Sequence, residues 1–169
     1  MPAGLKQTSS VVAIGFQTVE SGVDTFTQGI TDLNLSPLDQ EVFVVLSVNM
    51  DISAPQATDD INSFMAASLT STSQTAVQNL SNANCLAASA KVIQGAGATE
   101  WGAFFQTALE TPPANLDYIG IIATNDFYVQ VVGSNNTAAG QISGKVYGYR
   151  ARADAAIYAA LVQSEALSA

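Results

Sequence analysis

The sequence predicts an all-β protein: a single jelly-roll or β-sandwich domain of about eight strands with a short C-terminal helix. Two observations predict this class. Short runs rich in β-branched and aromatic residues recur every roughly 10–15 residues, separated by Gly, Pro, Asn and Ser, as in sandwiches and jelly rolls. The final segment, residues 153–166, is alanine-rich and contains no Gly or Pro. At 169 residues the chain has the length of one domain, which we expect to span residues 1–169.

Four strands are predicted in the first half of the chain, after a short N-terminal arm over residues 1–8. They cover residues 10–20, 23–30, 40–53 and 64–70. The third is the strongest, because apolar residues recur along it with a period of two. On one face we expect Val42, Val44, Leu46, Val48, Met50 and Ile52. The other face begins with Phe43 and ends with Asp51. We therefore expect both faces of this strand to be buried at its start and the second face to be exposed to solvent at its end.

The second half supplies the remaining strands and the helix. Strands are predicted over residues 84–94, 118–123, 127–132 and 141–150, and a strand or a short helix over residues 100–109. Residues 124–126 predict a hairpin between the strands on either side. Residues 71–84 are ambiguous, since Ser73 is able to cap a short helix. The C-terminal helix is expected over about residues 153–166, with Asp154 as its cap.

The charge of the chain is acidic and sparse. Five Lys and Arg stand against 14 Asp and Glu, a net charge of −9. Only 11% of the residues are charged, whereas an average soluble domain has about 25%. Such a protein is either a slightly sticky monomer or a subunit whose flanks are covered by neighbours, and we favour the second interpretation. The acidic balance argues against direct nucleic-acid binding, which needs a basic face.

The residues of nucleophilic and metal chemistry are scarce. The chain has no histidine and one cysteine, Cys85, which excludes a Ser-His-Asp triad, a Cys-His pair, a His-ligated metal and an internal disulfide framework. Gly95-Ala96-Gly97 predicts a tight turn, because Glu100 stands where a nucleotide-binding loop needs a third glycine. Asp59-Asp60 predicts a solvated loop, with a structural cation site as the alternative. We therefore expect no enzyme activity and no cofactor.

No segment predicts membrane insertion or export. No apolar run approaches the roughly 20 residues that span a bilayer. The first residues, Met1-Pro2-Ala3-Gly4-Leu5-Lys6-Gln7, lack the apolar core of a signal peptide. We therefore expect synthesis in the cytoplasm without a signal peptide.

Aromatic and basic residues are the candidates for contacts between subunits. They are Trp101, Phe104, Phe105, Tyr147, Tyr149, Arg150, Arg152 and Tyr158. The first three alternatively form core packing or a sugar-stacking platform. The next four lie near the end of the last strand, where alternation places Lys145 and the two tyrosines on one face and the two arginines on the other. Tyrosine suits half-wet interfaces, and these basic side chains suit an acidic neighbour or lipid head groups.

The strand count, the strong strand over residues 39–53 and the late hairpin into Lys145-Val146-Tyr147-Gly148-Tyr149-Arg150 resemble a viral single jelly-roll capsid protein. The narrower likeness is to the small major capsid proteins of tailless, membrane-containing icosahedral viruses of the sphaerolipovirus type. Residues 148–165 are also similar to environmental virion proteins. The resemblance implies two four-stranded sheets, no catalytic residues, and capsomers built with a second capsid protein over an inner membrane.

The sequence therefore predicts a structural virion protein. We expect a capsid subunit that assembles with copies of itself, or with a second capsid protein, into an icosahedral shell. A β-sandwich carbohydrate-binding module is one alternative, and a subunit of a fibre or surface layer is another. Closed symmetry turns many weak contacts into one stable particle, so no single contact residue needs to dominate.

Overall fold

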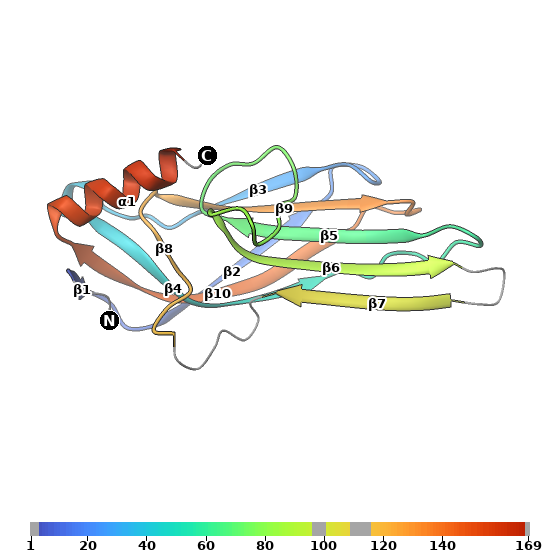
Figure 1. The fold of residues 1–169 in the computed structure, drawn as a ribbon, viewed down its shortest axis with the longest axis horizontal. Helices are drawn as coiled ribbons and strands as arrows, with labels where there is room; N and C mark the ends of the chain where they lie inside the picture. Colours follow the sequence, from blue (N-terminus) through green and yellow to red (C-terminus); the bar gives the residue numbers. More distant parts are fainter. Residues whose placement is uncertain (1–3, 96–100, 109–115, 168–169) are drawn as a thin grey trace.

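The computed structural model describes residues 4–95, 101–108 and 116–167, which form two facing antiparallel sheets and one helix (Figure 1). Sheet A contains β1 (Leu5–Gln7), β2 (Val12–Val19), β4 (Glu41–Ile52), β8 (Gly120–Ile122) and β10 (Gln141–Ala153). Sheet B contains β3 (Thr27–Asp32), β5 (Ser63–Thr70), β6 (Cys85–Gly95), β7 (Trp101–Ala108) and β9 (Asp126–Ser134). A 3-10 turn covers Pro37–Asp39, and α1 covers Ala155–Leu167.

The order of the strands is that of a jelly roll. In sheet A, β10 lies between β2 and β4, and β8 follows β4; in sheet B the order is β3-β9-β5-β6-β7. Without β1 and β7, each sheet has four strands, and successive strands of the chain lie in different sheets except for β5 and β6, which form a hairpin in sheet B. This arrangement of eight strands is the double Greek key of jelly rolls. The predicted fold class, including the short C-terminal helix, is confirmed.

The two additional strands extend the sheets. β1 pairs with the end of β10, with Leu5 opposite Ala153, so residues 5–7 of the predicted N-terminal arm are part of sheet A. β7 pairs with β6 along its whole length and forms the outer strand of sheet B. Residues 101–108 therefore adopt the strand rather than the helix of the two predicted alternatives.

The main core lies between the two sheets. Its largest fully buried side chains include Phe43, Phe127, Ile52, Met65, Leu69, Ile122 and Ile142. The Phe16 and Phe127 rings meet edge to face, with centroids 6.0 Å apart and planes at 82°. Each such side chain stabilises the fold by about 1.5–3 kcal/mol through removal of apolar surface from water, so this layer holds the two sheets together.

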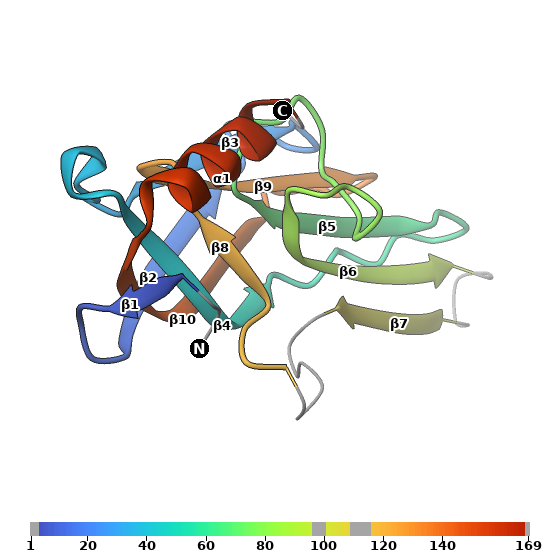
Figure 2. The same cartoon turned by 60° about the vertical axis from the view of Figure 1, so that its left-hand side comes forward.

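A second core lies on the outer side of sheet A, beneath α1 (Figure 2). The sheet contributes Val42, Val44, Tyr149, Ala151 and Ala153, and the helix contributes Ile157, Tyr158, Leu161 and Val162. Asp154 begins the helix, since its carbonyl oxygen accepts a hydrogen bond from the amide of Tyr158. The helix therefore covers one end of sheet A and leaves the other end of that face open.

The prediction of one continuous apolar face on β4 is wrong. β10 pairs Tyr147 with Ser47 but Gly148 with Val45, which leaves Leu46 as the extra residue of a β-bulge. A bulge inserts one residue and so exchanges the two faces of the strand beyond it. Val48, Met50 and Ile52 point into the main core, whereas Val42 and Val44 point to the helix.

The predicted hairpin across residues 124–126 is also wrong. β8 pairs with β4 in sheet A, whereas β9 pairs with β3 and β5 in sheet B. Residues 123–125 therefore cross from one sheet to the other. Residues 71–84, which are ambiguous in sequence, form a loop without a helix. The strand expected from residue 23 begins at Thr27, because the chain turns between Gly22 and Thr25, where Asp24 has a φ of 53°. The Gly95-Ala96-Gly97 turn lies largely outside the described residues.

Candidate interaction surfaces

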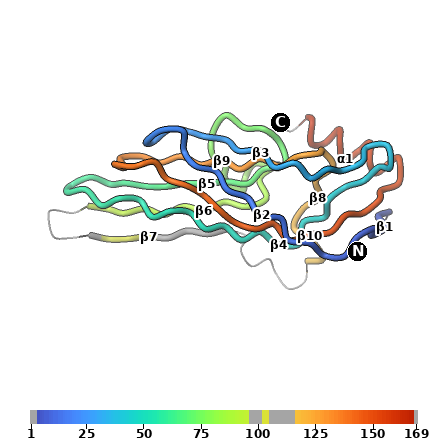
Figure 3. Tube along the Cα trace, turned by 180° about the vertical axis from the view of Figure 1, so that it is seen from behind, coloured from blue at the N-terminus to red at the C-terminus, as the bar shows by residue number. Residues whose placement is uncertain are grey.

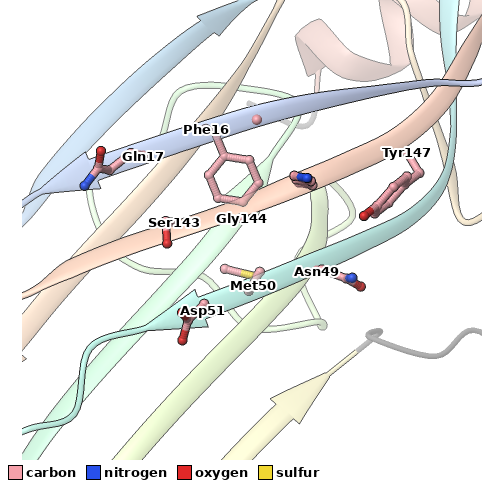
Figure 4. Close-up of a pocket in the computed structure, with 10 residues that line it drawn as sticks. Phe16, Gln17, Asn49, Met50, Asp51, Ser143, Gly144 and Tyr147 are labelled. Atoms are coloured by element: carbon pink, nitrogen blue, oxygen red, sulfur yellow. The ribbon is translucent and has the colours of Figure 1, made fainter.

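The open end of the outer face of sheet A carries a shallow hollow of about 630 Å³ (Figure 4). Two cross-strand rows contribute to it: Ser143 lies opposite Gln17 and Asp51, and Lys145 lies opposite Gly15 and Asn49. Tyr147 borders the hollow. Lys145 and Tyr147 thus share one outward face, as predicted.

Tyr149 lies in the interior of the protein. Its side chain is only 7% exposed, because α1 packs over it in the second core. Burial raises its pKa above the ordinary value of 10.0, and the nearby Asp117 carboxylate and Tyr118 add to this effect. Tyr158 reaches the same cluster from the helix. These two tyrosines therefore attach α1 to sheet A.

Arg150 fixes the connection between β3 and β4. Its Nη2 donates to the Leu33 carbonyl at 2.7 Å, and its Nη1 donates to the Asn34 carbonyl at 3.1 Å and lies 3.4 Å from the Glu41 carboxylate. The guanidinium group therefore contacts two backbone carbonyl groups and one carboxylate, and its several N–H donors allow all of these contacts at once. Arg152 is exposed and stands between Lys6 and Glu41 in the sheet register, so it remains accessible from outside.

Trp101, Phe104 and Phe105 all lie on β7 at the outer edge of sheet B. The Phe104 side chain is 57% exposed. The side chains of Trp101 and Phe105 lie outside the part of the chain that the structure describes. The register places Phe104 beside Val92 of β6, which in turn lies beside Phe64 of β5, so one apolar row crosses three strands.

A groove of about 540 Å³ borders this row on the outer face of sheet B. Its floor consists of small residues of β5 and β6, including Ala66, Ala88 and Ala90, and the loop over residues 71–84 forms its wall with Val77 and Leu80. Phe64 is 38% exposed at its rim. The outer face of sheet B therefore carries both an apolar row and a groove with a floor of small residues.

A set of loops lies at the opposite end of the molecule from α1 (Figure 3), and polar side chains join these loops to one another. The Glu20 carboxylate accepts from the amide of Gly133 at 2.6 Å and from the amide of Gly140 at 2.7 Å. Asp24 accepts from both the backbone and the side-chain amide of Asn136. Asn136 in turn accepts from the amide of Gln56. These bonds connect the β2–β3, β4–β5 and β9–β10 loops into one unit.

Sequence reasoning missed this unit. Glu20 precedes Ser21-Gly22, and Asn136 lies in a polar loop, so neither residue differs in sequence from an ordinary turn residue. Their roles depend on partners more than 100 positions away. Asp59 and Asp60 lie in the same region, in a turn closed by the pairing of Thr58 with Ile61. Within the described ranges, no group of three or more Asp, Glu or Cys residues is placed to hold a metal ion.

The Cys85 thiol is predicted to be inert in the folded protein. Its side chain is 8% exposed, and burial raises its pKa from 9.0 to about 11. Because the thiolate is the reactive form, a thiol-specific disulfide reagent at mildly alkaline pH should label the native protein very slowly and the denatured protein rapidly. Absorbance of the released dye measures both rates, and equal rates would contradict this prediction.

Glu165 joins the C-terminal half of α1 to the crossing between the sheets. The side chain is 7% exposed, and its two carboxylate oxygens accept from the amides of Ala123 at 3.1 Å and Thr124 at 3.0 Å. Burial raises the pKa of this carboxyl above its ordinary value of 4.5, although the two amides act in the opposite direction. The crossing that replaces the predicted hairpin is thus held by a helix residue.

This raised pKa predicts a pH dependence of stability. The folded state prefers the protonated carboxyl more than the unfolded state does, so the contribution of Glu165 is fully present below pH 4.5 and is lost as the pH rises through the raised value. We expect the unfolding free energy of the wild type, relative to the Glu165→Gln variant, to increase as the pH is lowered from neutral. Urea unfolding across this range measures the difference, and a difference independent of pH would contradict the prediction.

Among the described helices, none is long and apolar enough to cross a membrane.

Comparisons with known proteins give one structural likeness. No protein-family model matches the chain, and no curated protein matches it. A chain in a solved structure of Desmodium yellow mottle tymovirus is similar over 92% of this chain and 95% of that chain, with 15% sequence identity and a TM-score of 0.35. The likeness is confined to overall chain architecture.

Proposed function

We propose that this protein is a structural subunit of a virion shell that assembles with copies of itself. The observation that carries the proposal is the exposed side of α1. Its outward residues are Ala155, Ala156, Ala159, Ala160, Gln163, Ser164, Ala166 and Leu167, and none is charged. A helix that faces solvent normally carries charged residues on its outer side, so this surface suits close contact with another protein.

The fold supports the same proposal. Jelly rolls of two Greek keys are the architecture of many viral capsid domains, and also of lectin domains. In this chain the hydrogen-bonded loop unit around Glu20 and Asn136 lies at one end and α1 lies at the other. A subunit in a closed shell needs rigid ends and sides that match its neighbours. Co-assembly with a second capsid protein, contact with an inner membrane, location in the virion and the sphaerolipovirus-type likeness remain predictions.

Purified protein tests the proposal directly. We expect light scattering over a series of protein and salt concentrations to show discrete large species, and negative-stain microscopy of the same samples to show closed particles of uniform diameter. Open filaments or flat arrays would instead favour a fibre or surface-layer subunit. A monodisperse monomer under every condition would contradict self-assembly.

The hollow on sheet A favours a second candidate, a carbohydrate-binding module, because an aromatic ring and several hydrogen-bonding side chains line it. Tyr147 borders it, and Gln17, Asn49 and Asp51 offer hydrogen-bonding groups that suit sugar hydroxyls (Figure 4). Sugar binding that is lost on Tyr147→Ala, in a protein that stays monomeric, would favour this candidate. A glycan array without binding would remove it.

A further inference from the structure

The outer edge of sheet B is a long strand without the usual protection against pairing. β7 (Trp101–Ala108) pairs with β6, and within the described residues it has no pairing partner on its other side. Natural edge strands avoid unwanted pairing through charged residues, proline, bulges or short length. The eight residues of β7 include no Lys, Arg, Asp, Glu or Pro, and its register with β6 has no shift. Its backbone is thus suited to accept another strand.

The other edges of the two sheets are closed or short. β2 and β3 are the edge strands on one side, and they lie against each other so closely that a β-carbon on Gly29 would overlap Thr18. β8, the edge strand of sheet A on the other side, has only three residues. β7 lies away from this closed side, at the margin of the molecule in Figures 1 and 2. It is therefore the edge with both the length and the access for a further strand.

We propose that β7 pairs antiparallel with β7 of a second copy of this chain, so that two sheets of type B join into one continuous sheet. This inference rests on the proposed function for its setting, a shell built from copies of the chain. The choice of a second copy follows from charge. The chain carries a net charge of −9, so most surfaces of two copies repel each other, whereas two β7 strands bring no like charges together.

Symmetry restricts the register of this pairing. A twofold axis perpendicular to the sheet keeps the same face outward in both copies, so directly opposite residues must point to the same face. The register centred on Phe104 fulfils this condition and uses nearly the whole strand. It places each Phe104 opposite its own copy, and cross-strand aromatic pairs stabilise antiparallel sheets. The apolar row from Phe64 through Val92 to Phe104 would then continue across the axis.

The contact is small, which fits a role inside a larger assembly. Edge pairing of one strand buries much less than the roughly 1,200–2,000 Å² of a stable isolated interface. We therefore expect a weak dimer in dilute solution that becomes fully populated in assembled particles, where other contacts hold both copies in place.

Disulfide trapping tests the pairing. Directly opposite residues of antiparallel strands have Cα atoms about 4.5–5.5 Å apart, within the range for a disulfide. Phe104→Cys should therefore convert most of the protein to a covalent dimer under mild oxidation. Ala103→Cys is the matched control, since Ala103 is exposed, adjacent in sequence and on the other face, and it should stay monomeric. The natural Cys85 is buried, so the wild-type protein should form no covalent dimer and serves as the negative control.

A second pair of variants tests the noncovalent contact. Phe104→Lys places two like charges opposite each other and should abolish the dimer in sedimentation velocity. Phe64→Lys introduces the same charge on the same face, two strands away from the edge, and should leave the dimer intact. Circular dichroism of all variants verifies that each one folds.

The outcomes separate this inference from the proposed function. Trapping of Phe104→Cys together with a monomeric Ala103→Cys supports the pairing. Equal trapping of both variants, or preferential trapping of Ala103→Cys, overturns it. If particles form but Phe104→Cys is not trapped in them, the pairing is wrong and the proposed function stands. If trapped dimers form but no particles appear under any condition, the pairing stands and the proposed function is wrong.

Discussion

Replacement of Phe127 by alanine is expected to lower the free energy of unfolding by about 3–5 kcal/mol. Phe127 on β9 is 0% exposed and lies in the middle of the main core, where its ring meets the edge of Phe16 at a centroid distance of 6.0 Å. Truncation removes the buried ring and leaves a cavity between the two sheets. Since native domains are stable by only about 5–15 kcal/mol, urea unfolding followed by circular dichroism should show a large shift of the midpoint.

Phe104→Ala is the matched control for this variant. It removes the same ring from a strand of the same sheet, but Phe104 is 57% exposed. Exposed substitutions usually change stability by less than about 0.5 kcal/mol, so the unfolding midpoint should hardly move. A comparable loss in both variants would show that Phe127 is not part of a packed core.

Replacement of Glu20 by alanine is expected to lower the free energy of unfolding by about 2–5 kcal/mol. The change removes the acceptor of two buried hydrogen bonds, those donated by the backbone amides of Gly133 and Gly140. Each buried donor left without an acceptor costs about 1–3 kcal/mol. Amide hydrogen exchange should also accelerate selectively in residues 133–140. Reduced stability together with local opening of residues 133–140 distinguishes the loss of these two hydrogen bonds from a general loss of packing.

Two further variants define the role of the carboxylate. Glu20→Gln keeps the size but presents an NH₂ group to one of the two amide donors, so we expect an intermediate loss of stability. Asp51→Ala removes an exposed acidic residue from the end of β4 and should change stability by less than about 0.5 kcal/mol. If Glu20→Ala behaved like Asp51→Ala, the loop unit would not depend on this residue.

The strands were predictable where they depend on local patterns. β2, β4, β6 and β10 appear close to the predicted limits, because β-branched and aromatic residues recur in short runs between turn residues. The faces of β4 were not predictable, because the bulge at Leu46 appears only when β10 is paired beside it. Because side chains alternate between the two faces of a strand, one inserted residue exchanges the buried and the exposed side chains beyond it.

The partners of each strand were less predictable than the strands themselves. Residues 124–126 have the composition of a hairpin turn, yet the chain crosses there from one sheet to the other. β8 pairs with β4 in sheet A, whereas β9 lies between β3 and β5 in sheet B and pairs with both. Glu165 stabilises this crossing from 41 or more residues away. Neither relationship leaves a signal within a short window of sequence.

For the candidate contact residues too, local features were predictable from the sequence and tertiary contacts were not. The alternation on β10 correctly separated the face of Lys145 and Tyr147 from that of Arg150, because period two is a local property. Burial of Tyr149 depends on where α1 lies, and the contacts of Arg150 depend on the position of the Leu33 and Asn34 carbonyls. Both are decided by tertiary structure.

The central place of β10 in sheet A also determines when the protein is able to fold. β10 is the last strand of the chain, yet it lies between β2 and β4, and Leu5 at the start of the chain pairs with Ala153. Contacts between residues so far apart in sequence make folding slow, because a long loop must close before they form. On the ribosome, β2 has no neighbour in sheet A until residues 141–153 emerge, and β4 has only the three residues of β8. The nascent chain therefore keeps incompletely paired, apolar strands until β10 is synthesised, and its yield in cells should depend on chaperones that protect such strands.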